Sequence, residues 1–386
     1  MLRVGIVGAG GISTAHIDAY LEFPDSVEIV AISDLTTAKA AAKRDAHGLR
    51  DARVYDSSDA MLDAERLDLV SIVTPPSSHA PLAIQFLRHG VDVIVEKPMA
   101  ASLEECDAMI AAAAESGRIL SVIAQNRYRD DMATLKEVLA TGLIGTISHV
   151  KVDSSWWRDL PYYDLWWRGT WASEGGGCTL NHAIHHIDLM LWLLGRPRAI
   201  AAMITNAQHD NAEVEDLSVA ILQYDRALAE LTSSVVHHGE EQAIVVQGER
   251  ARISQPWRAV AARGDENGFP LPGGDAELVA RLDALAAAHT PLAHVRHAGQ
   301  IANVIAAIRG EAALEATGAD GRAAIEVVTA IYQAALERRT IDLPLLSDNP
   351  YYRTGGLESR APHFFEKTGS RSDQSAIVVG ASSDLG

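Results

Sequence analysis

Short apolar runs alternate with Ala-rich amphipathic stretches through the first 125 residues of the chain. The apolar runs are Arg3–Val7, Val27–Ser33, Leu69–Val73, Asp92–Val95 and Ile119–Ala124. The helical patterns between them are Thr36–His47, His79–His89 and Leu103–Glu115. Short apolar strands separated by helices are typical of a parallel sheet that is covered on both faces. The pattern therefore predicts a doubly wound α/β domain over residues 1–125.

The pattern changes near Asn126, where longer runs with partial alternation begin. After a helical stretch at Met132–Ala140, the strand-like runs are Ile147–Ser155, Ala199–Thr205, Leu217–Tyr224, Leu228–Val236 and Gln242–Gln247. They predict a large, mostly antiparallel open sheet with one covered face. Further helices are predicted at Leu180–Leu194, Ala293–Arg309 and Arg322–Arg338, with Gly318, Asp320 and Gly321 forming the turn and cap before the last one. We expect an α+β domain over residues 126–345.

The end of the chain has a different composition. Pro344 marks the end of the predicted compact part, and residues 346–386 are rich in Ser, Gly and charged side chains. We predict an irregular tail here, with a short added strand at Ala376–Val379.

Composition narrows the class of protein. A chain of 386 residues with 48% hydrophobic and 22% charged residues suits two globular domains. The formal net charge of −18 argues against a nucleic-acid or anionic-membrane surface. The two cysteines make no disulfide framework, and no apolar run reaches the roughly 18 residues that a membrane span needs. These features predict a cytoplasmic protein.

A glycine-rich loop opens the chain, with Gly8, Gly10 and Gly11 between a predicted strand and a helix that begins near Ile12. Gly8 permits a tight turn, and Gly10 lets the backbone approach a pyrophosphate at the helix N-terminus. The third position of the dinucleotide fingerprint, normally Gly or Ala, is Ser13 here. The context of strand, loop and helix predicts a dinucleotide site.

Asp34 ends the second predicted strand at the position where such a site places an acidic residue. A carboxylate there accepts hydrogen bonds from ribose hydroxyls and repels a ribose phosphate, so NAD is favoured over NADP. Lys39 nearby opposes that preference in part. The alternative interpretation is a glycine turn followed by a helix-capping Asp.

Two further segments follow predicted parallel strands, at the edge of the sheet where ligands bind. The first segment is Thr74–His79, whose prolines fix an extended turn. The second is Glu96–Lys97–Pro98, in which the proline biases Lys97 toward an extended conformation and holds its ammonium at this edge. The predicted cofactor contacts from these segments are Thr74, Pro75, His79, Glu96 and Lys97.

Polar residues interrupt the apolar helix predicted at Leu180–Leu194. Asn181, His185, Asp188 and Trp192 have the spacing of one helix face, and buried polar groups there need partners, which a ligand supplies. Gly175–Gly177 remove side chains just before this helix and would let a substrate or nicotinamide ring approach.

Two blander interpretations compete with a ligand site on this helix. His185 can be a core histidine bonded to Asp188. The three histidines His182, His185 and His186 can bind a metal, but no HExxH-type base or cysteine cluster accompanies them, so we predict no metal site.

Trp156–Trp171 is an aromatic run that includes Arg158 and Arg168. This mixture suits a wall that stacks on sugar rings and bonds their hydroxyls, whereas the alternative is an unusual core. The predicted substrate contacts are Lys97, Arg127, Trp166, Arg168, Asn181 and His185.

Together these motifs resemble the Gfo/Idh/MocA oxidoreductase family. The matching pieces are the glycine loop, Glu96–Pro98, the GGGxxxNxxxHxxD pattern at Gly175–Asp188, and Ala323–Leu345. The resemblance implies an N-terminal Rossmann domain, a C-terminal domain whose open sheet makes a homodimer or homotetramer, and sugars, inositols or sugar derivatives as substrates. Asn181 differs from many members of the family, which have Asp at this position. The resemblance therefore does not specify the route of the proton.

The resulting hypothesis is an NAD(P)-dependent dehydrogenase with Lys97, His185 and Asn181 as catalytic residues. His185 takes the hydroxyl proton, Lys97 stabilises the developing alkoxide, and Asn181 positions a substrate hydroxyl. Asp188 orients His185 or bonds the backbone. The alternatives are an NAD-dependent lyase or glycosidase that oxidises a sugar transiently, and a non-catalytic NAD- or sugar-sensing protein.

Overall fold

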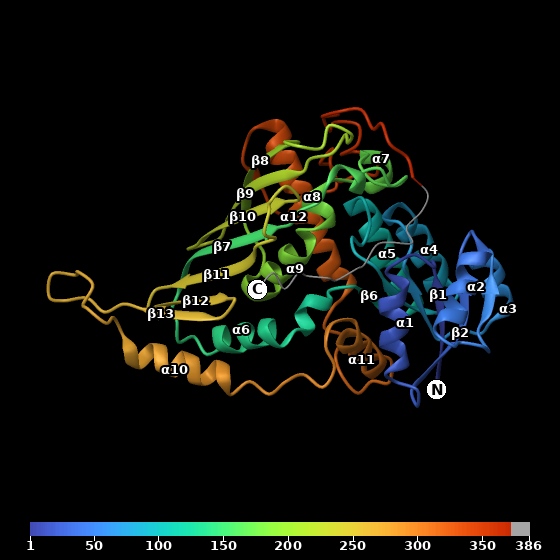
Figure 1. The fold of residues 1–386 in the computed structure, drawn as a ribbon, viewed down its shortest axis with the longest axis horizontal. Helices are drawn as coiled ribbons and strands as arrows, with labels where there is room; N and C mark the ends of the chain where they lie inside the picture. The colour runs from blue at the N-terminus through green and yellow to red at the C-terminus, as the bar shows by residue number, and fades with distance from the viewer. Residues whose placement is uncertain (372–386) are drawn as a thin grey trace.

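The computed structural model describes residues 1–371 and contains two β-sheets, each flanked by helices (Figure 1). The first sheet has six strands in the order β3-β2-β1-β4-β5-β6, and every neighbouring pair is parallel. Its strands are β1 Leu2–Val7, β2 Val27–Ser33, β3 Arg53–Tyr55, β4 Leu69–Ile72, β5 Asp92–Val95 and β6 Leu120–Val122. This order is that of the dinucleotide-binding Rossmann fold, which confirms the predicted doubly wound sheet.

Helices cover both faces of the first sheet. They are α1 Ser13–Leu21, α2 Thr37–Ala46, α3 Ser58–Ala64, α4 His79–Arg88 and α5 Leu103–Ser116. Alternate side chains of the strands enter two separate hydrophobic clusters, one around Phe86 and Leu87 of α4 and one around Ile17 and Tyr20 of α1. Helix α11 (Arg296–Ile308), from far along the chain, packs beside α1 and completes the second cluster.

The second sheet has eight strands in the order β13-β12-β11-β7-β10-β9-β8-β14. Neighbours are antiparallel except β7 and β10, which are parallel. Its strands are β7 Ile147–Ser155, β8 Ala199–Thr205, β9 Leu217–Gln223, β10 Leu228–Ser234, β11 Gln242–Gly248, β12 Ala251–Gln255, β13 Arg258–Ala261 and β14 Ile341–Asp342. The predicted mostly antiparallel sheet is therefore confirmed, although the prediction omitted β12 and β13.

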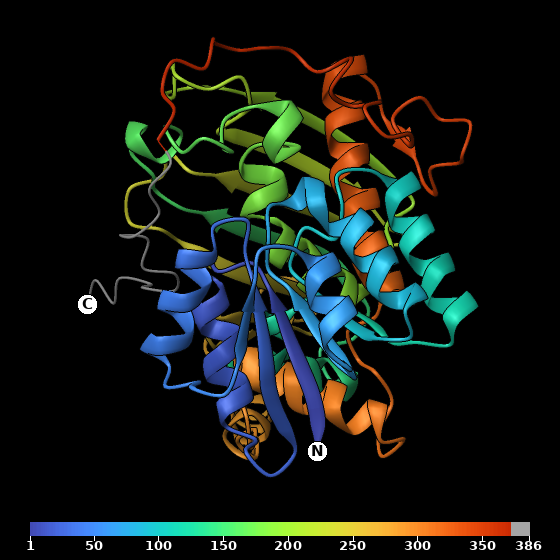
Figure 2. The ribbon, with the colours of Figure 1, turned by 90° about the vertical axis from the view of Figure 1, so that its right-hand side faces the viewer.

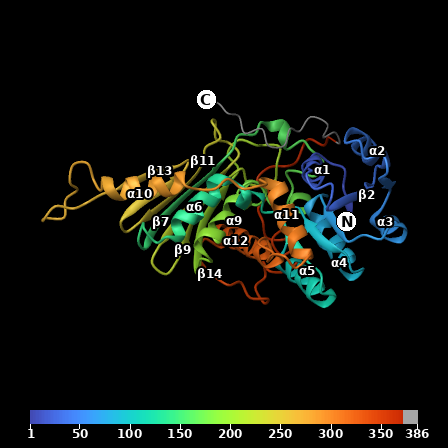
Figure 3. The same cartoon turned by 90° about the horizontal axis from the view of Figure 1, so that it is seen from below.

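Helices cover one face of the second sheet. They are α6 Asp130–Ala140, α9 Ile184–Leu194 and α12 Gly318–Glu337, and α10 Ala276–Ala287 packs beside β13 and α6 (Figures 1 and 3). Strand β9 shows the alternation: Ala220 and Leu222 are buried, whereas Val219 and Ile221 are exposed. The two sheets are separated in the chain by residues 123–146, and the domain boundary near residue 126 stays a prediction.

The helix predicted over Leu180–Leu194 is wrong as one continuous element. The structure divides it into α8 (Cys178–Asn181) and α9, with His182 and Ala183 between them. The buried Glu215 carboxylate accepts hydrogen bonds from the backbone N–H groups of Gly177 and Thr179, and it thereby fixes the start of the short first helix. The predicted single face from Asn181 to Trp192 is therefore interrupted.

The cap of α12 also differs from the prediction. Thr317 is the N-cap, and its hydroxyl accepts from the Asp320 N–H while the Asp320 carboxylate accepts from the Thr317 N–H. Gly318 is the first helical residue, and Gly321 allows close packing on Val122 and Met99.

The compact part of the molecule does not end at Pro344. Residues 346–371 are irregular, as predicted, but they pack against the body of the protein (Figure 2). Tyr351 is buried, and the Tyr352 hydroxyl donates to the Asp107 carboxylate on α5. The sequence pattern missed this packing because few apolar residues signal it. The predicted strand at Ala376–Val379 lies outside the described residues. Among residues 1–371, no helix combines the length and apolar character needed to cross a membrane.

Candidate active site

An open cleft of about 1440 Å³ runs along the carboxyl ends of β1, β2, β4 and β5 and continues to the aromatic segment Trp156–Trp171. Gly10, Gly11 and Ile12 line it at the N-terminus of α1. Gly8 has a φ of +106°, and a Cβ there would meet the Val73 backbone, so the tight turn requires glycine. The turn and the helix N-terminus leave backbone N–H groups facing the cleft, which fits a pyrophosphate.

Asp34 lies in the cleft at the end of β2, where the sequence pattern placed it. Its two carboxylate oxygens accept from the backbone N–H groups of Ala9, at 2.9 Å, and Thr36, at 2.8 Å. Each oxygen keeps a second lone pair for a ribose hydroxyl. Asp34 therefore holds the glycine loop in place and remains available to a ligand.

In the Thr74–His79 segment, some residues line the cleft, whereas His79 lies beneath the segment and supports it. Thr74 and Pro75 line the cleft. His79 does not, because its ring is buried beneath the segment and its two nitrogens lie 2.8 Å from the carbonyl oxygens of Pro98 and Thr74. The structure thus places His79 as a support for two cleft loops, and its predicted direct contact with the cofactor has no geometric support.

Glu96 lines the cleft but is buried among histidines. Its carboxylate lies 3.0 Å from His16 Nε2 and 3.6 Å from His297 Nε2, and it accepts from the Lys97 N–H. Burial alone would raise the pKa of Glu96, but hydrogen bonds and charges from the two histidines outweigh it and lower the pKa well below its ordinary value. This cluster links α1, the end of β5 and α11, and no motif in the sequence indicates that His297 lies here.

Lys97 is held where the prediction placed it. Its ammonium donates a hydrogen bond of 3.0 Å to the backbone carbonyl of Asn181, which joins the end of β5 to α8. Burial lowers the pKa of Lys97, and the charge of Glu96 opposes this shift. The ammonium therefore retains two N–H donors for a ligand.

The imidazole of His185 lies in the same cleft and makes no hydrogen bond to any other described residue. Burial and then the positive charge of Lys97 lower the pKa of His185 well below its ordinary value, so its imidazole is neutral near pH 7. A neutral, unpaired imidazole is competent to accept a proton.

Asn181 presents only part of its amide to the cleft. Its nitrogen donates to the carbonyl oxygens of Gly176, at 2.9 Å, and Gly177, at 3.3 Å, and its Oδ1 accepts no bond from the described residues. The glycines are needed for packing within the protein: a Cβ at Gly176 would overlap Tyr332, and one at Gly177 would overlap Glu215. The expectation that they open space for a ligand is therefore wrong.

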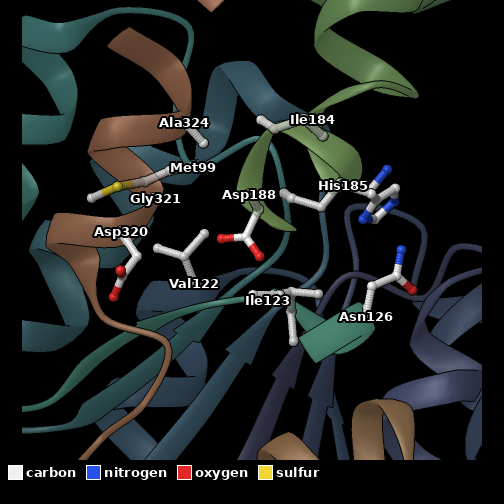
Figure 4. Close-up of a pocket in the computed structure, with 12 residues that line it drawn as sticks. Met99, Val122, Ile123, Asn126, Ile184, His185, Asp188, Asp320, Gly321 and Ala324 are labelled. Carbon is white, nitrogen blue, oxygen red and sulfur yellow. The ribbon is translucent and has the colours of Figure 1, made fainter. Parts of the chain in front are cut away.

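Asp188 and Arg127 form an ion pair with each other. Asp188 therefore does not contact His185, and Arg127 is not placed to contact a substrate. Arg127 Nη2 lies 2.6 Å from Asp188 Oδ1, and Arg127 Nε lies 2.9 Å from Oδ2. Arg127 is buried, and its Nη1 donates to the Glu315 carbonyl. Figure 4 shows the Asp188 carboxylate directed away from the His185 ring. The predicted orientation of His185 by Asp188 is wrong, and Arg127 has its donors committed to the protein.

A small cavity adjoins Lys97 and His185. It is lined by Lys97, His185, Asp188 and also Asn126, which the sequence prediction did not include (Figure 4). Its volume of about 20 Å³ accommodates a single water molecule.

The aromatic segment forms the far wall of the cleft. Trp166, Trp167 and Arg168 line it, and the Trp166 side chain is half exposed. The Arg168 guanidinium stacks 4.0 Å from the Trp167 ring and 4.1 Å from the Tyr162 ring, and it donates to a buried Glu174 carboxylate at 2.7 Å. Such stacking produces a flat, rigid surface.

The three histidines considered as metal ligands do not form a group with metal-compatible spacing among residues 1–371. His182 Nε2 lies 3.3 Å from the Tyr162 hydroxyl, and burial lowers the pKa of His186 to about 4. Within residues 1–371, the one group with metal-compatible spacing is His16, Glu96 and His297. Direct hydrogen bonding between His16 and Glu96 accounts for this group without an ion.

The parallel sheet, glycine turn and acidic residue at β2 define the class of a dinucleotide-binding oxidoreductase. The model described as "Oxidoreductase family, NAD-binding Rossmann fold" matches residues 2–124, and the "GFO/IDH/MocA C-terminal domain" model matches residues 132–254. The chain belongs to the Gfo/Idh/MocA oxidoreductase family, which confirms the resemblance drawn from its motifs.

Individual relatives agree with this assignment. The chain is 27% identical to scyllo-inositol 2-dehydrogenase (NADP(+)) IolW of Bacillus subtilis, over 89% of this chain and 96% of that protein. It is 27% identical to an inositol 2-dehydrogenase of Rhizobium meliloti, over 89% and 99%. Among solved structures, the WlbA dehydrogenase of Bordetella pertussis, in complex with NADH and UDP-GlcNAcA, aligns with a TM-score of 0.76 at 29% identity, over 89% and 98%.

Proposed function

We propose that this protein is an NAD-dependent dehydrogenase that oxidises a secondary alcohol of a sugar, an inositol or a sugar derivative to a ketone. The observation that carries this proposal is a neutral, unpaired His185 next to a fixed Lys97 ammonium, at the end of a cleft that begins with a dinucleotide-binding loop. The relatives named as inositol dehydrogenases support the substrate class.

The residues divide the chemistry between them. His185 accepts the proton of the substrate hydroxyl, while the Lys97 ammonium donates a hydrogen bond to the same oxygen as it becomes an alkoxide. Asn181 Oδ1 accepts from a neighbouring hydroxyl and orients the ring. NAD, when bound, supplies the hydride acceptor, and the ketone forms as the C–H bond breaks.

Asp34 supports NAD as the cofactor over NADP. Asp56 and Asp59 also line this end of the cleft, so a ribose phosphate would enter a negative region in which Lys39 is a single counter-charge. The relative IolW is named as NADP-linked, so this preference distinguishes the chain from that relative.

The aromatic wall supports a ring-shaped polar substrate. The flat surfaces of Trp166 and Trp167 suit the C–H face of a sugar or cyclitol, and the Lys97 and Asn181 groups opposite suit its hydroxyls. The two alternatives considered above, a transient-oxidation lyase and a sensor, gain no specific support from the site.

A panel assay tests the proposal. The purified protein is incubated with NAD or NADP and with scyllo-inositol, myo-inositol, levoglucosan, a methyl glucoside or UDP-GlcNAcA, and NADH absorbance and substrate loss are followed together. Substrate-dependent NADH formation is expected with at least one compound. Substrate loss without net NADH, or no reaction with any compound despite NAD binding, would contradict the proposal.

A further inference from the structure

The last described residues of the chain contact the wall of the cleft. We call Pro362–Arg371 the C-terminal strap and Trp156–Trp171 the aromatic loop. In Figure 1 the strap is the red segment that passes over α7 (Trp171–Glu174), at the end of the aromatic loop. The strap lies outside the residues that both family models match.

One end of the strap pairs with the aromatic loop through backbone hydrogen bonds. The Arg371 N–H donates to the Asp164 carbonyl at 2.6 Å, and the Trp166 N–H donates to the Arg371 carbonyl at 3.0 Å. Arg371 and Leu165 thereby form a parallel β-bridge. The Arg371 guanidinium adds a bond of 2.7 Å to the Pro161 carbonyl. The backbone just before Trp167 and Arg168 is therefore held by the strap.

Lys367 makes a second connection in the middle of the strap. Its ammonium donates to the carbonyl oxygens of Tyr163 and Leu165, two residues whose side chains are buried. Buried carbonyl groups need donors, and Lys367 supplies them where the irregular loop has no ladder of its own. Gly369 lies so close to Asp164 that a Cβ at this glycine would overlap the carboxylate.

The other end of the strap is anchored at the base of the aromatic loop. The Trp171 indole N–H donates to the Pro362 carbonyl at 2.8 Å, and the Phe364 N–H donates to the Glu213 carbonyl at 3.0 Å. The strap therefore contacts the aromatic loop from Pro161 to Trp171. Between these anchors lie Trp166, Trp167 and Arg168, the loop residues that face the cleft.

We propose that the C-terminal strap positions the aromatic loop and thereby sets the affinity for the carbohydrate, with Lys367 as the main positioning residue. The inference rests on the proposed function, because the loop matters only if a substrate ring binds against it. Lys367 touches neither the cleft nor Lys97 or His185, so it acts through the loop.

Two variants and a matched control test whether the strap holds the aromatic loop. Lys367→Met keeps the length of the side chain and removes its donors, Gly369→Val introduces the overlap with Asp164, and Glu366→Ala changes an exposed neighbour. Hydrogen exchange is measured on the peptide covering 160–171 in the NAD-bound protein. We expect exchange about tenfold faster in the first two variants and unchanged in Glu366→Ala. Equal exchange in all three would overturn the proposal.

Kinetics tests the functional part with whichever panel compound yields NADH. We expect the KM for that compound to rise about tenfold in Lys367→Met, with the Kd for NAD unchanged and kcat altered far less than KM. A KM equal to that of the wild type would overturn the proposal, as would equal losses of NAD and carbohydrate affinity. If the wild type forms no NADH with any compound, the proposed function fails, whereas the exchange measurement still decides whether the strap holds the loop.

Discussion

Lys97 and His185 are coupled through charge as well as through position. Lys97 holds the pKa of His185 down, so removing the ammonium raises that pKa. In Lys97→Met we expect kcat to fall about 10²–10⁴-fold, with little change in the Kd for NAD. The residual activity has an acidic limb at higher pH than in the wild type, because His185 then protonates more readily.

The pH profile of kcat/KM for the two proteins measures this shift, and Lys151→Met on the second sheet serves as a charge-matched control. An acidic limb at the same pH in the wild type and in Lys97→Met would contradict the electrostatic coupling. Parallel losses of NAD binding and turnover would contradict the catalytic role of Lys97.

Asp34 governs the choice of cofactor at the other end of the cleft. Asp34→Ala removes the acceptor for the ribose hydroxyls and the repulsion of a ribose phosphate. We expect the ratio of kcat/KM for NAD to that for NADP to fall by at least about tenfold. Steady-state kinetics with both cofactors checks this, with Asp63→Ala, an exposed carboxylate that does not line the cleft, as the control. An unchanged ratio would place the discrimination elsewhere.

The positions of residues that depend on local context were predictable from the sequence. The contacts of residues whose partner is distant in the chain were not. Lys97 and Asp34 follow strands directly, so their place at the sheet edge was predictable. Asp188 has the spacing to meet His185, but Arg127, which is 61 residues away in the chain, takes its carboxylate. A stronger, bidentate ion pair displaced the local contact.

At the scale of elements, Glu215 fixes the short helix that carries Asn181. Burial raises the pKa of Glu215 to about 7, against the lowering effect of its hydrogen bonds from Thr179 and Tyr332. The folded state therefore binds a proton more tightly than the unfolded chain, whose carboxyl has an ordinary, lower pKa. This contribution to stability is complete at acidic pH and is lost as the pH rises through about 7.

Comparison with Glu215→Gln, which mimics the protonated side chain, isolates this effect. We expect the free energy of unfolding of the wild type, relative to the variant, to decrease by about 3 kcal/mol between pH 5 and pH 8. Denaturant unfolding at the two pH values checks it. A difference that is constant or grows with pH would show that Glu215 is ionised in the fold.

The break between α8 and α9 illustrates what an element-level prediction lacks. The helical pattern continues through His182 and Ala183 without a proline or glycine, so no local signal marks the break. The start of α8 is set by the Glu215 carboxylate, which comes from a distant element and accepts hydrogen bonds from the Gly177 and Thr179 N–H groups. Strands β7 and β8, by contrast, have the predicted bounds because their side-chain alternation is local.

At the scale of the whole molecule, the outer face of the second sheet remains uncovered within the described chain. Met203, Val219, Ile221 and Leu228 are exposed on β8, β9 and β10. Adjacent exposed apolar side chains are typical of an interface. This supports the predicted homodimer or homotetramer, whereas the predicted cytoplasmic location has no structural counterpart.

Changing this face tests the assembly. Ile221→Lys places a charge at the centre of the exposed apolar residues, and we expect it to convert an oligomer to a smaller species. Light scattering with size-exclusion chromatography measures the mass, with Leu346→Lys, which adds the same charge at an exposed apolar residue outside the sheet, as the control. A wild type that is monomeric at micromolar concentration would rule out the predicted assembly.

The fold class and the order of the two sheets along the chain were predictable from periodicity, but two long-range arrangements were not. Helix α11 packs on the first sheet although its neighbours in the chain belong to the second, and the segment beyond Pro344 returns to the aromatic loop. Both depend on tertiary contacts that leave no periodic signal in the sequence.

The proposed reaction transfers a hydride from the carbinol carbon of a carbohydrate to NAD in this cleft. The most direct measurement uses a substrate deuterated at that carbon, with mass spectrometry of the cofactor after reaction. We expect deuterium in the NADH that is formed. In Lys97→Met we expect the rate of deuterated NADH formation to fall in proportion to kcat. Deuterium that returns to the product without net NADH, or NADH that carries none, would contradict it.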